Sequence, residues 1–267
     1  MSTNGFPTRR VKGCQSAVRD KPSSMNTAIP LFLALLTLFG TTAYTQDTKA
    51  KKKRPAHGAM AQVTDVEGLP RVLLIGDSIS IGYTVHLRNL LKGKANVHRP
   101  RTNCGPTTKG LAGIEDWLKT GGEGKKWDVI HFNWGLHDLK YMGKDGSNLA
   151  APNNPESQQQ VPPAEYEKNL TQLTQRLKMT GAKLIWRNTT PVPEGSQGRV
   201  VGDSAKYNAI AAKIMSQEGI PTDDLFTFTK ENPSLIKKAN VHYTPEGSKA
   251  LAAQVAKAIE KALGDCN

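Results

Sequence analysis

The sequence predicts a three-layer α/β/α domain, in which a doubly wound, mostly parallel five-stranded sheet lies between two layers of helices. Two observations lead to this class. Short apolar runs alternate along the chain with longer stretches of helical periodicity, and repeated β-α units of this kind form parallel sheets. The runs are also apolar without alternation, as expected of strands that are covered on both faces.

Three apolar runs predict buried parallel strands, at 71–76 (RVLLIG), 127–134 (WDVIHFNW) and 182–187 (AKLIWR). Two shorter runs, at 95–99 (ANVHR) and 219–226 (GIPTDDLF), complete the expected sheet.

Stretches with helical periodicity separate these strands, near 80–92, 107–119, 163–180, 203–218 and 245–263. The last stretch follows Thr244-Pro245, which predicts a threonine cap and a proline at the first helical position. One connection is longer than an ordinary α/β loop: residues 140–162 are polar and rich in Gly, Pro and Asn. Such a loop is either disordered or a functional rim. We favour a rim, because it follows the end of the central strand.

The N-terminal part of the chain has a different composition. Residues 28–39 are an apolar run with basic residues upstream and small residues downstream, and a run this short suits a signal peptide better than a membrane span of about 20 residues. We expect 1–45 to be a signal-peptide region, with an uncleaved anchor as the alternative, and the mature protein to be secreted or periplasmic. The Lys/Ala-rich segment 46–69 is expected to be a flexible linker, and 70–264 to be the folded domain.

The net charge of +13 first suggests an anionic partner. Residues 1–54 carry ten Lys or Arg and two acids, however, so +8 of this charge precedes the domain and only +5 remains. No nucleic-acid motif is present, and we expect no nucleic-acid partner. The sequence has no CxxC and no clustered His/Cys set, so no metal or cofactor is expected. Export would permit a disulfide between Cys104 and Cys266.

The tripeptide Gly-Asp-Ser occurs twice, as 76–78 and as 202–204. Ser78 ends a buried strand at the sheet edge where ligands bind, and a helix begins just beyond it, so the sequence favours Ser78 as a nucleophile. Ser204 follows no such strand, and there Asp203 or Ser204 is interpreted as a helix N-cap.

A serine nucleophile needs a base, which is usually a histidine. Two of the six histidines lie in connections that can reach the ends of the strands: His137 follows the central strand, and His242 precedes the last helix. The other four lie in the linker, within strands or within a helix, at His57, His86, His98 and His131.

Four blocks in order resemble the SGNH (GDSL-type) hydrolases, a family of serine esterases and lipases. They are Ile75-Gly76-Asp77-Ser78, Asn103-Cys104-Gly105-Pro106-Thr107-Thr108, Gly135-Leu136-His137-Asp138 and Val241-His242-Tyr243-Thr244-Pro245-Glu246-Gly247. The resemblance covers roughly residues 70–264. It implies a catalytic domain of flavodoxin-like topology with Ser78 as the nucleophile and His242 as the base. It also implies an oxyanion hole formed by the N–H groups of Ser78 and Gly105 and the side chain of His137.

Two positions depart from the family pattern. His137 stands where the family has an asparagine, although a neutral imidazole also has one N–H donor. Ala239 stands where the family has the aspartate that orients the catalytic histidine. Three replacements are open: the Asn240 side chain, a backbone carbonyl of residues 237–240, or a carboxylate from elsewhere, namely Asp223 or Asp224. We favour the backbone carbonyl, because it requires no special residue, whereas the Asn240 side chain should point away from that of Val241.

The resemblance and the residues together predict a secreted serine esterase. Its expected substrates are small-molecule or glycan esters with short acyl groups, such as acetyl groups on carbohydrates, and after signal cleavage no membrane contact is expected. The alternative is an SGNH-like module that binds glycans with little or no turnover, motivated by the missing acid. A flavodoxin-like mononucleotide-binding domain also agrees with the fold class, but the sequence lacks a phosphate-binding motif. The sequence makes no prediction of the oligomeric state.

Overall fold

The computed structural model describes residues 58–264. The expected signal region 1–45, the first part of the expected linker, and Cys14 and Cys266 lie outside these residues. Cys104 lies inside them, fully buried and with a free thiol.

A five-stranded parallel sheet forms the centre of the domain, in the order β2-β1-β3-β6-β7. Its strands are β1 (Arg71–Ile75), β2 (Asn96–His98), β3 (Val129–Phe132), β6 (Lys183–Arg187) and β7 (Thr222–Asp223). In the centre of the sheet, Leu73 pairs with Ile130, which in turn pairs with Leu184. The expectation of a parallel, doubly wound, five-stranded sheet is therefore confirmed.

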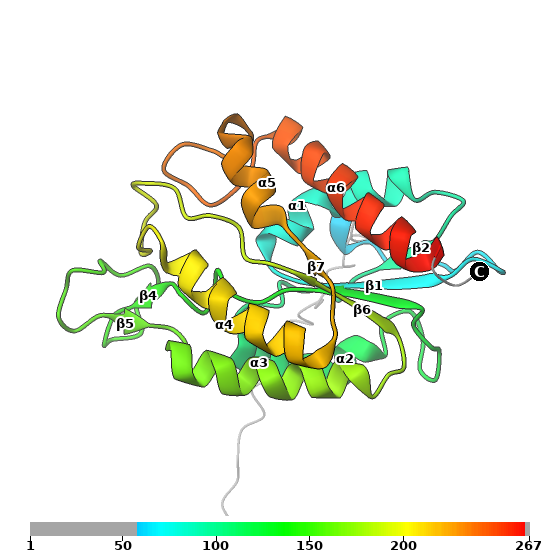
Figure 1. Cartoon of the computed structure of the whole chain (residues 1–267), viewed down its shortest axis with the longest axis horizontal. Helices are drawn as coiled ribbons and strands as arrows, with labels where there is room; N and C mark the ends of the chain where they lie inside the picture. The colour runs from blue at the N-terminus through cyan, green and yellow to red at the C-terminus, as the bar shows by residue number, and fades with distance from the viewer. Residues whose placement is uncertain (1–57, 265–267) are drawn as a thin grey trace, which may run out of the picture. The chain divides into compact units, whose positions relative to one another are not determined.

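Helices cover both faces of the sheet (Figure 1). One layer contains α1 (Ser78–Leu90), α5 (Leu225–Glu231) and α6 (Pro245–Gly264), and the other contains α2 (Thr107–Leu118), α3 (Pro163–Lys178) and α4 (Asp203–Glu218). The expected helices are all present within a few residues of their predicted bounds. None of the described helices is long and apolar enough to cross a membrane.

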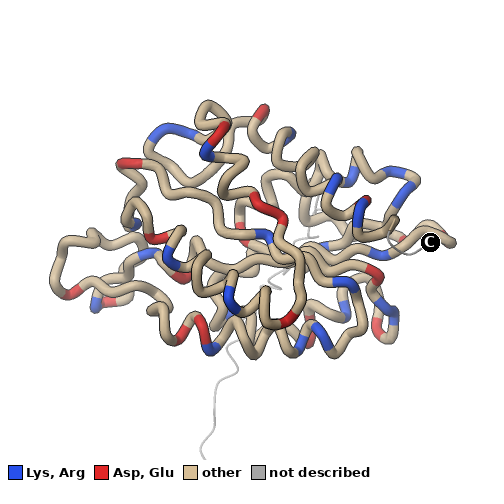
Figure 2. Tube along the Cα trace, in the orientation of Figure 1, with Lys and Arg blue, Asp and Glu red and all other residues tan. Residues whose placement is uncertain are grey.

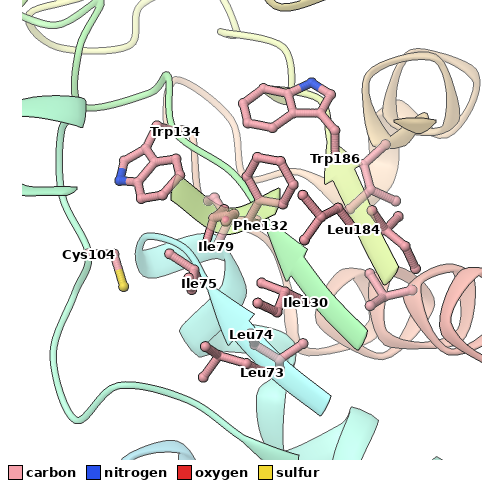
Figure 3. Packing of buried hydrophobic residues seen from close by; sticks show 14 of the residues in the cluster. Leu73, Leu74, Ile75, Ile79, Cys104, Ile130, Phe132, Trp134, Leu184 and Trp186 are labelled. Atoms are coloured by element: carbon pink, nitrogen blue, oxygen red, sulfur yellow. The ribbon is translucent and has the colours of Figure 1, made fainter. Parts of the chain in front are cut away.

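The core lies where the central strands meet these helices (Figure 3). All five residues of β1 and all four of β3 are buried, which explains why their sequences are apolar without alternation. Phe132 and Trp186 meet edge to face across β3 and β6, with ring centroids 5.3 Å apart. The strands that carry the site are thus fixed by packing on both faces.

The run 219–226 differs from its predicted strand. Only Thr222–Asp223 pairs in the sheet, and α5 begins at Leu225. The cause is Asp224, whose side chain accepts the Thr227 N–H at 2.9 Å and caps α5.

The second half of the segment expected to be a linker is held against the domain. Residues Gly58–Met60 form a short 3-10 helix, and Arg88 of α1 donates to the backbone oxygens of Gly58 and Ala61. Asp65 forms ion pairs with Arg71 at 3.1 Å and with Lys125 at 2.6 Å. These contacts extend the folded unit upstream of residue 70.

The long connection 140–162 contains a two-stranded antiparallel hairpin, β4 (Tyr141–Met142) and β5 (Gln158–Gln159). Figure 1 shows it beyond one end of the sheet, near the beginnings of α3 and α4. The Tyr141 N–H donates to the Gly198 oxygen, and the Val161 N–H to the Asp138 oxygen. The hairpin is therefore connected to the loops that follow β3 and β6.

Charged residues of both signs are interspersed over the described part of the chain (Figure 2). This pattern agrees with the small excess of positive charge that the sequence assigns to the domain.

Candidate active site

The turn between β1 and α1 presents Ser78. The side chain of Asp77 accepts the Ile79 N–H at 3.0 Å and caps α1, so Ser78 is the first helical residue. A side chain at Gly76 would lie 2.9 Å from Ser80 Oγ and would have to displace this buried serine, so the turn favours glycine. Asp77 is buried and Ser78 is partly exposed, so the serine hydroxyl is the group that the turn offers to solvent.

The loop before α6 brings His242 to this hydroxyl. Nε2 of His242 lies 2.9 Å from Ser78 Oγ, although 164 positions separate the two residues. Val241 and Tyr243 are buried on either side of His242, and the His242 oxygen accepts the Lys237 N–H. The chain therefore forms a tight loop from which the imidazole projects toward Ser78. As predicted, Thr244 caps the following helix by accepting the Gly247 N–H at 2.9 Å.

The other ring nitrogen of His242 contacts Asn240. Asn240 Oδ1 lies 2.7 Å from His242 Nδ1 and also accepts the His242 backbone N–H at 2.9 Å. The structure thus differs from our preference for a backbone carbonyl. Ala239 has a left-handed backbone, with φ of 50°, and Asn240 forms an Asx turn, in which the side-chain oxygen folds back onto the backbone two residues on. The turn therefore directs the Asn240 side chain toward the His242 ring.

Neither candidate carboxylate lies at His242. Asp223 is buried and lies 3.0 Å from Nε2 of His131, inside the sheet. Asp224 accepts the Asn188 side chain at 2.6 Å in addition to capping α5. Both are therefore engaged in structural contacts elsewhere.

The second Gly-Asp-Ser copy is arranged differently. Gly202, with φ of 91°, is the N-cap residue of α4, and no side chain caps this helix. The interpretation of Asp203 or Ser204 as a cap is wrong, because the left-handed glycine sets the turn and both residues are already helical. Ser204 is 1% exposed, so its hydroxyl is not available to a ligand.

Gly105 is the residue that the sequence predicts as a second backbone donor of the oxyanion hole. It follows β2, immediately before α2, and has a φ of 60°. Its N–H donates to Asn103 Oδ1 at 2.9 Å, so this donor is engaged by a neighbouring side chain. This contact is a second Asx turn, and no residue pattern considered above predicts it.

His137 lies in the loop that follows β3 and is partly buried. Burial lowers the pKa of His137 to about 4, and the charges of Lys140, Arg199 and Lys109 act in the same direction, against Asp77. The imidazole is therefore neutral near pH 7 and retains one N–H donor. The ring forms no hydrogen bond with any other described residue.

Partial burial also lowers the pKa of His242, and the charges of Arg199 and Lys237 add to this effect, against that of Asp77. A histidine that is neutral at pH 7 can accept a proton from Ser78.

A buried polar network below Ser78 was missed by the sequence argument. The Arg187 side chain is 1% exposed, and Nη2 donates to Asn133 Oδ1 and lies 3.4 Å from Asp77 Oδ1. Asn133 follows β3 and Arg187 ends β6, so both side chains reach the same sheet edge as Ser78. The sequence feature that could have predicted this network is a polar residue at the end of each of these two apolar strands.

The fold and this site together define a class of protein: an α/β/α domain with a hydrogen-bonded serine and histidine at the carboxyl edge of a parallel sheet. Several solved structures share the fold of this class. The chain superimposes on an acetyl xylan esterase, AlAXEase, with a TM-score of 0.56 and 17% identity over 71% of this chain and 99% of that one. A lipase/acylhydrolase from Enterococcus faecalis superimposes with a TM-score of 0.56 and 17% identity, over 72% of this chain and 96% of that one. For an acetylxylan esterase from Geobacillus stearothermophilus, the TM-score is 0.56 and the identity 18%, over 70% of this chain and 93% of that one.

At these identities, the shared feature is the fold. The expected fold of the SGNH (GDSL-type) hydrolases is therefore confirmed, and a GDSL-like lipase from Bacteroides thetaiotaomicron also has it, with a TM-score of 0.53. No protein-family profile matches the sequence, and no curated protein matches it.

Proposed function

We propose that the protein is a serine ester hydrolase in which Ser78 is the nucleophile and His242 the general base. The observation that carries this proposal is the chain of contacts from Ser78 Oγ through the His242 imidazole to Asn240 Oδ1, at 2.9 and 2.7 Å. An acceptor at Nδ1 fixes the tautomer in which Nε2 is free to take the serine proton. The shared fold of known esterases supports the same reaction.

Each half of the reaction, acylation and deacylation, uses two proton transfers. Ser78 Oγ attacks the ester carbonyl while its proton moves to His242 Nε2, and His242 then donates that proton to the leaving alcohol. Water attacks the acyl-enzyme by the same route in reverse, which releases the carboxylic acid and restores Ser78. Asn240 holds His242 throughout but, being neutral, stabilises the imidazolium less than an aspartate would.

The negative charge on the carbonyl oxygen needs donors in both steps. The Ser78 N–H lies in the first turn of α1, where backbone donors are unpaired within the helix. His137 supplies a neutral N–H. Gly105 supplies a third donor if its N–H exchanges Asn103 Oδ1 for the oxyanion.

The substrate class proposed here is a short-chain acyl ester, and in particular an acetyl ester of a carbohydrate. Two of the solved structures that share the fold are acetyl xylan esterases by name. The polar hairpin β4–β5 beyond the sheet is better suited to a sugar than to a long acyl chain.

The test is covalent labelling with a fluorophosphonate, followed by peptide mass spectrometry. We expect a label on Ser78, no label in Ser78→Ala, and unchanged labelling in the matched variant Ser204→Ala. Hydrolysis of 4-nitrophenyl acetate should show the same pattern. If neither label nor turnover is found in folded protein, the alternative of a glycan-binding module without turnover replaces the esterase.

We also propose that the protein is exported, with cleavage near residues 43–45. The support is the apolar run 28–39, which lies outside the described residues. N-terminal sequencing of exported protein tests this proposal. A sequence that begins at Met1 or Met25 would favour an uncleaved anchor.

A further inference from the structure

Two cationic side chains, Lys140 and Arg199, lie at the same corner of the site. The Tyr141 N–H donates to the Gly198 oxygen at 2.8 Å, and Lys140 and Arg199 are the chain neighbours of these two bonded residues. Arg199 Nε also donates to the Leu136 oxygen at 3.1 Å, directly before the loop residue His137. The backbone therefore holds both cations beside the proposed oxyanion donors.

Neither cation has a counter-ion among residues 58–264. No described carboxylate lies within 4.0 Å of either group, and the Lys140 amine has no hydrogen-bond acceptor there, although the residue is only 8% exposed. Asp138 is near Lys140 in the chain, but its Oδ1 accepts two hydrogen bonds from Thr107. Burial raises the pKa of Asp138 to about 7, so this carboxyl is not a fixed negative charge.

This arrangement is unfavourable in the protein alone. Two like charges held near each other repel, and the repulsion is stronger where the residues are partly buried. Burial, and next the charge of Arg199, lower the pKa of Lys140. A negatively charged ligand between the two groups would remove this repulsion.

We propose that Lys140 and Arg199 form a subsite for an oxyanion on the substrate, a carboxylate or a sulfate group, so that the enzyme acts on esters of anionic glycans. Arg199 Nη2 and Lys140 Nζ have no acceptor among the described residues, so these donors remain for the ligand. Lys109 and Lys237 are near enough to lower the pKa of His137 and of His242, respectively, and add to the positive field. The assignment of the ligand as a substrate rests on the proposed esterase function.

Binding can be tested without turnover, by isothermal titration calorimetry on the Ser78→Ala protein. The probes are unacetylated oligogalacturonate, a sulfated oligosaccharide and a neutral xylo-oligosaccharide of equal length. We expect at least one anionic probe to bind 10-fold more tightly than the neutral one, and the tighter anionic probe identifies carboxylate or sulfate. Arg199→Gln and Lys140→Met, each added to Ser78→Ala, should weaken that binding 10-fold or more.

The matched control is Lys178→Gln, which removes a cation paired with Glu218 at the end of α3. It should leave the affinity unchanged. Equal binding of neutral and anionic probes, or an equal loss in the Lys178→Gln control, would overturn the subsite.

Two further measurements test the role of Lys140 and the link between anion binding and ester hydrolysis. Lys140→Met should raise the Tm of the ligand-free protein, because it removes a positive charge held beside Arg199, and a lower Tm would reject a ligand-binding role for Lys140. In the catalytically competent protein, Arg199→Gln should lower the ratio of kcat/KM for acetylated oligogalacturonate to that for acetylated xylo-oligosaccharide, if carboxylate is the group recognised. Selective binding of an anion without hydrolysis of any ester would reject the esterase and leave the subsite standing.

Discussion

Asn240 Oδ1 lies 2.7 Å from Nδ1 of His242, on the side of the ring opposite the nitrogen that faces Ser78. The position is that of the orienting acid in a triad, but the acceptor is a neutral amide. Replacing Asn240 by aspartate would exchange the amide nitrogen for an oxygen and leave the shape of the side chain unchanged.

Asn240→Asp is expected to raise kcat for 4-nitrophenyl acetate by about 10-fold, which corresponds to roughly one pKa unit of added imidazolium stabilisation. Ala239→Asp is the matched control. The Ala239 Cβ lies 3.1 Å from the place where a side chain on Gly195 would begin, so a carboxylate there faces Gly195 and should not raise kcat. If Ala239→Asp raises kcat more than Asn240→Asp does, the assignment of Asn240 is wrong.

The activity of the wild type should extend further to acidic pH than an ordinary histidine allows, because burial and nearby cations hold the pKa of His242 below 6.5. The acid limb of the pH profile of kcat/KM is therefore expected below pH 6.5. Asn240→Asp should move that limb to higher pH, since a carboxylate favours protonated His242. An acid limb that stays in place would show that Asn240 does not contact His242 in solution.

His137→Ala should lower kcat by about 10² to 10³, the scale for loss of one oxyanion donor. His137→Asn retains an N–H donor, and part of the activity should return. Steady-state kinetics on folded variants decide between this role and a structural one, for which the Ala variant would match the wild type.

The same residue predicts a change in stability with pH. The pKa of His137 is lowered to about 4 in the folded protein, so the unfolded chain binds more protons at this site between about pH 4 and 6.5. The free energy of unfolding should therefore fall as the pH falls through this window, and it should fall less in His137→Asn. Urea titrations of both proteins at several pH values measure the difference, and parallel curves would contradict the prediction.

Asn103→Ala is expected to raise kcat if Gly105 is an oxyanion donor, because the Gly105 N–H would lose its competing acceptor. Thr102→Ala in the same loop is a control that leaves this contact intact. A lower kcat in Asn103→Ala would mean instead that the Asx turn is needed to hold Gly105 in place.

Long apolar runs and helical periodicity were sufficient to predict the sheet and five helices, because these elements depend mainly on which faces are buried. They also placed Ser78 and His242 at one sheet edge. Periodicity does not predict local turns. The left-handed backbone of Ala239 redirects Asn240, and the helix cap at Asp224 shortens the last strand. The pair Lys140 and Arg199 was missed for another reason, since it depends on a backbone contact between segments more than 50 positions apart.

The hairpin at 140–162 has a consequence for the thermodynamics of recognition. Its strands pair with each other, and backbone hydrogen bonds from Tyr141 and Val161 tie it to the loops that carry Arg199 and Asp138. A mobile loop loses conformational entropy when a ligand orders it, at roughly 0.5 to 1.5 kcal/mol for each side chain immobilised. Here the backbone of the hairpin is already ordered by these bonds, so a glycan that contacts it would have only side chains left to order.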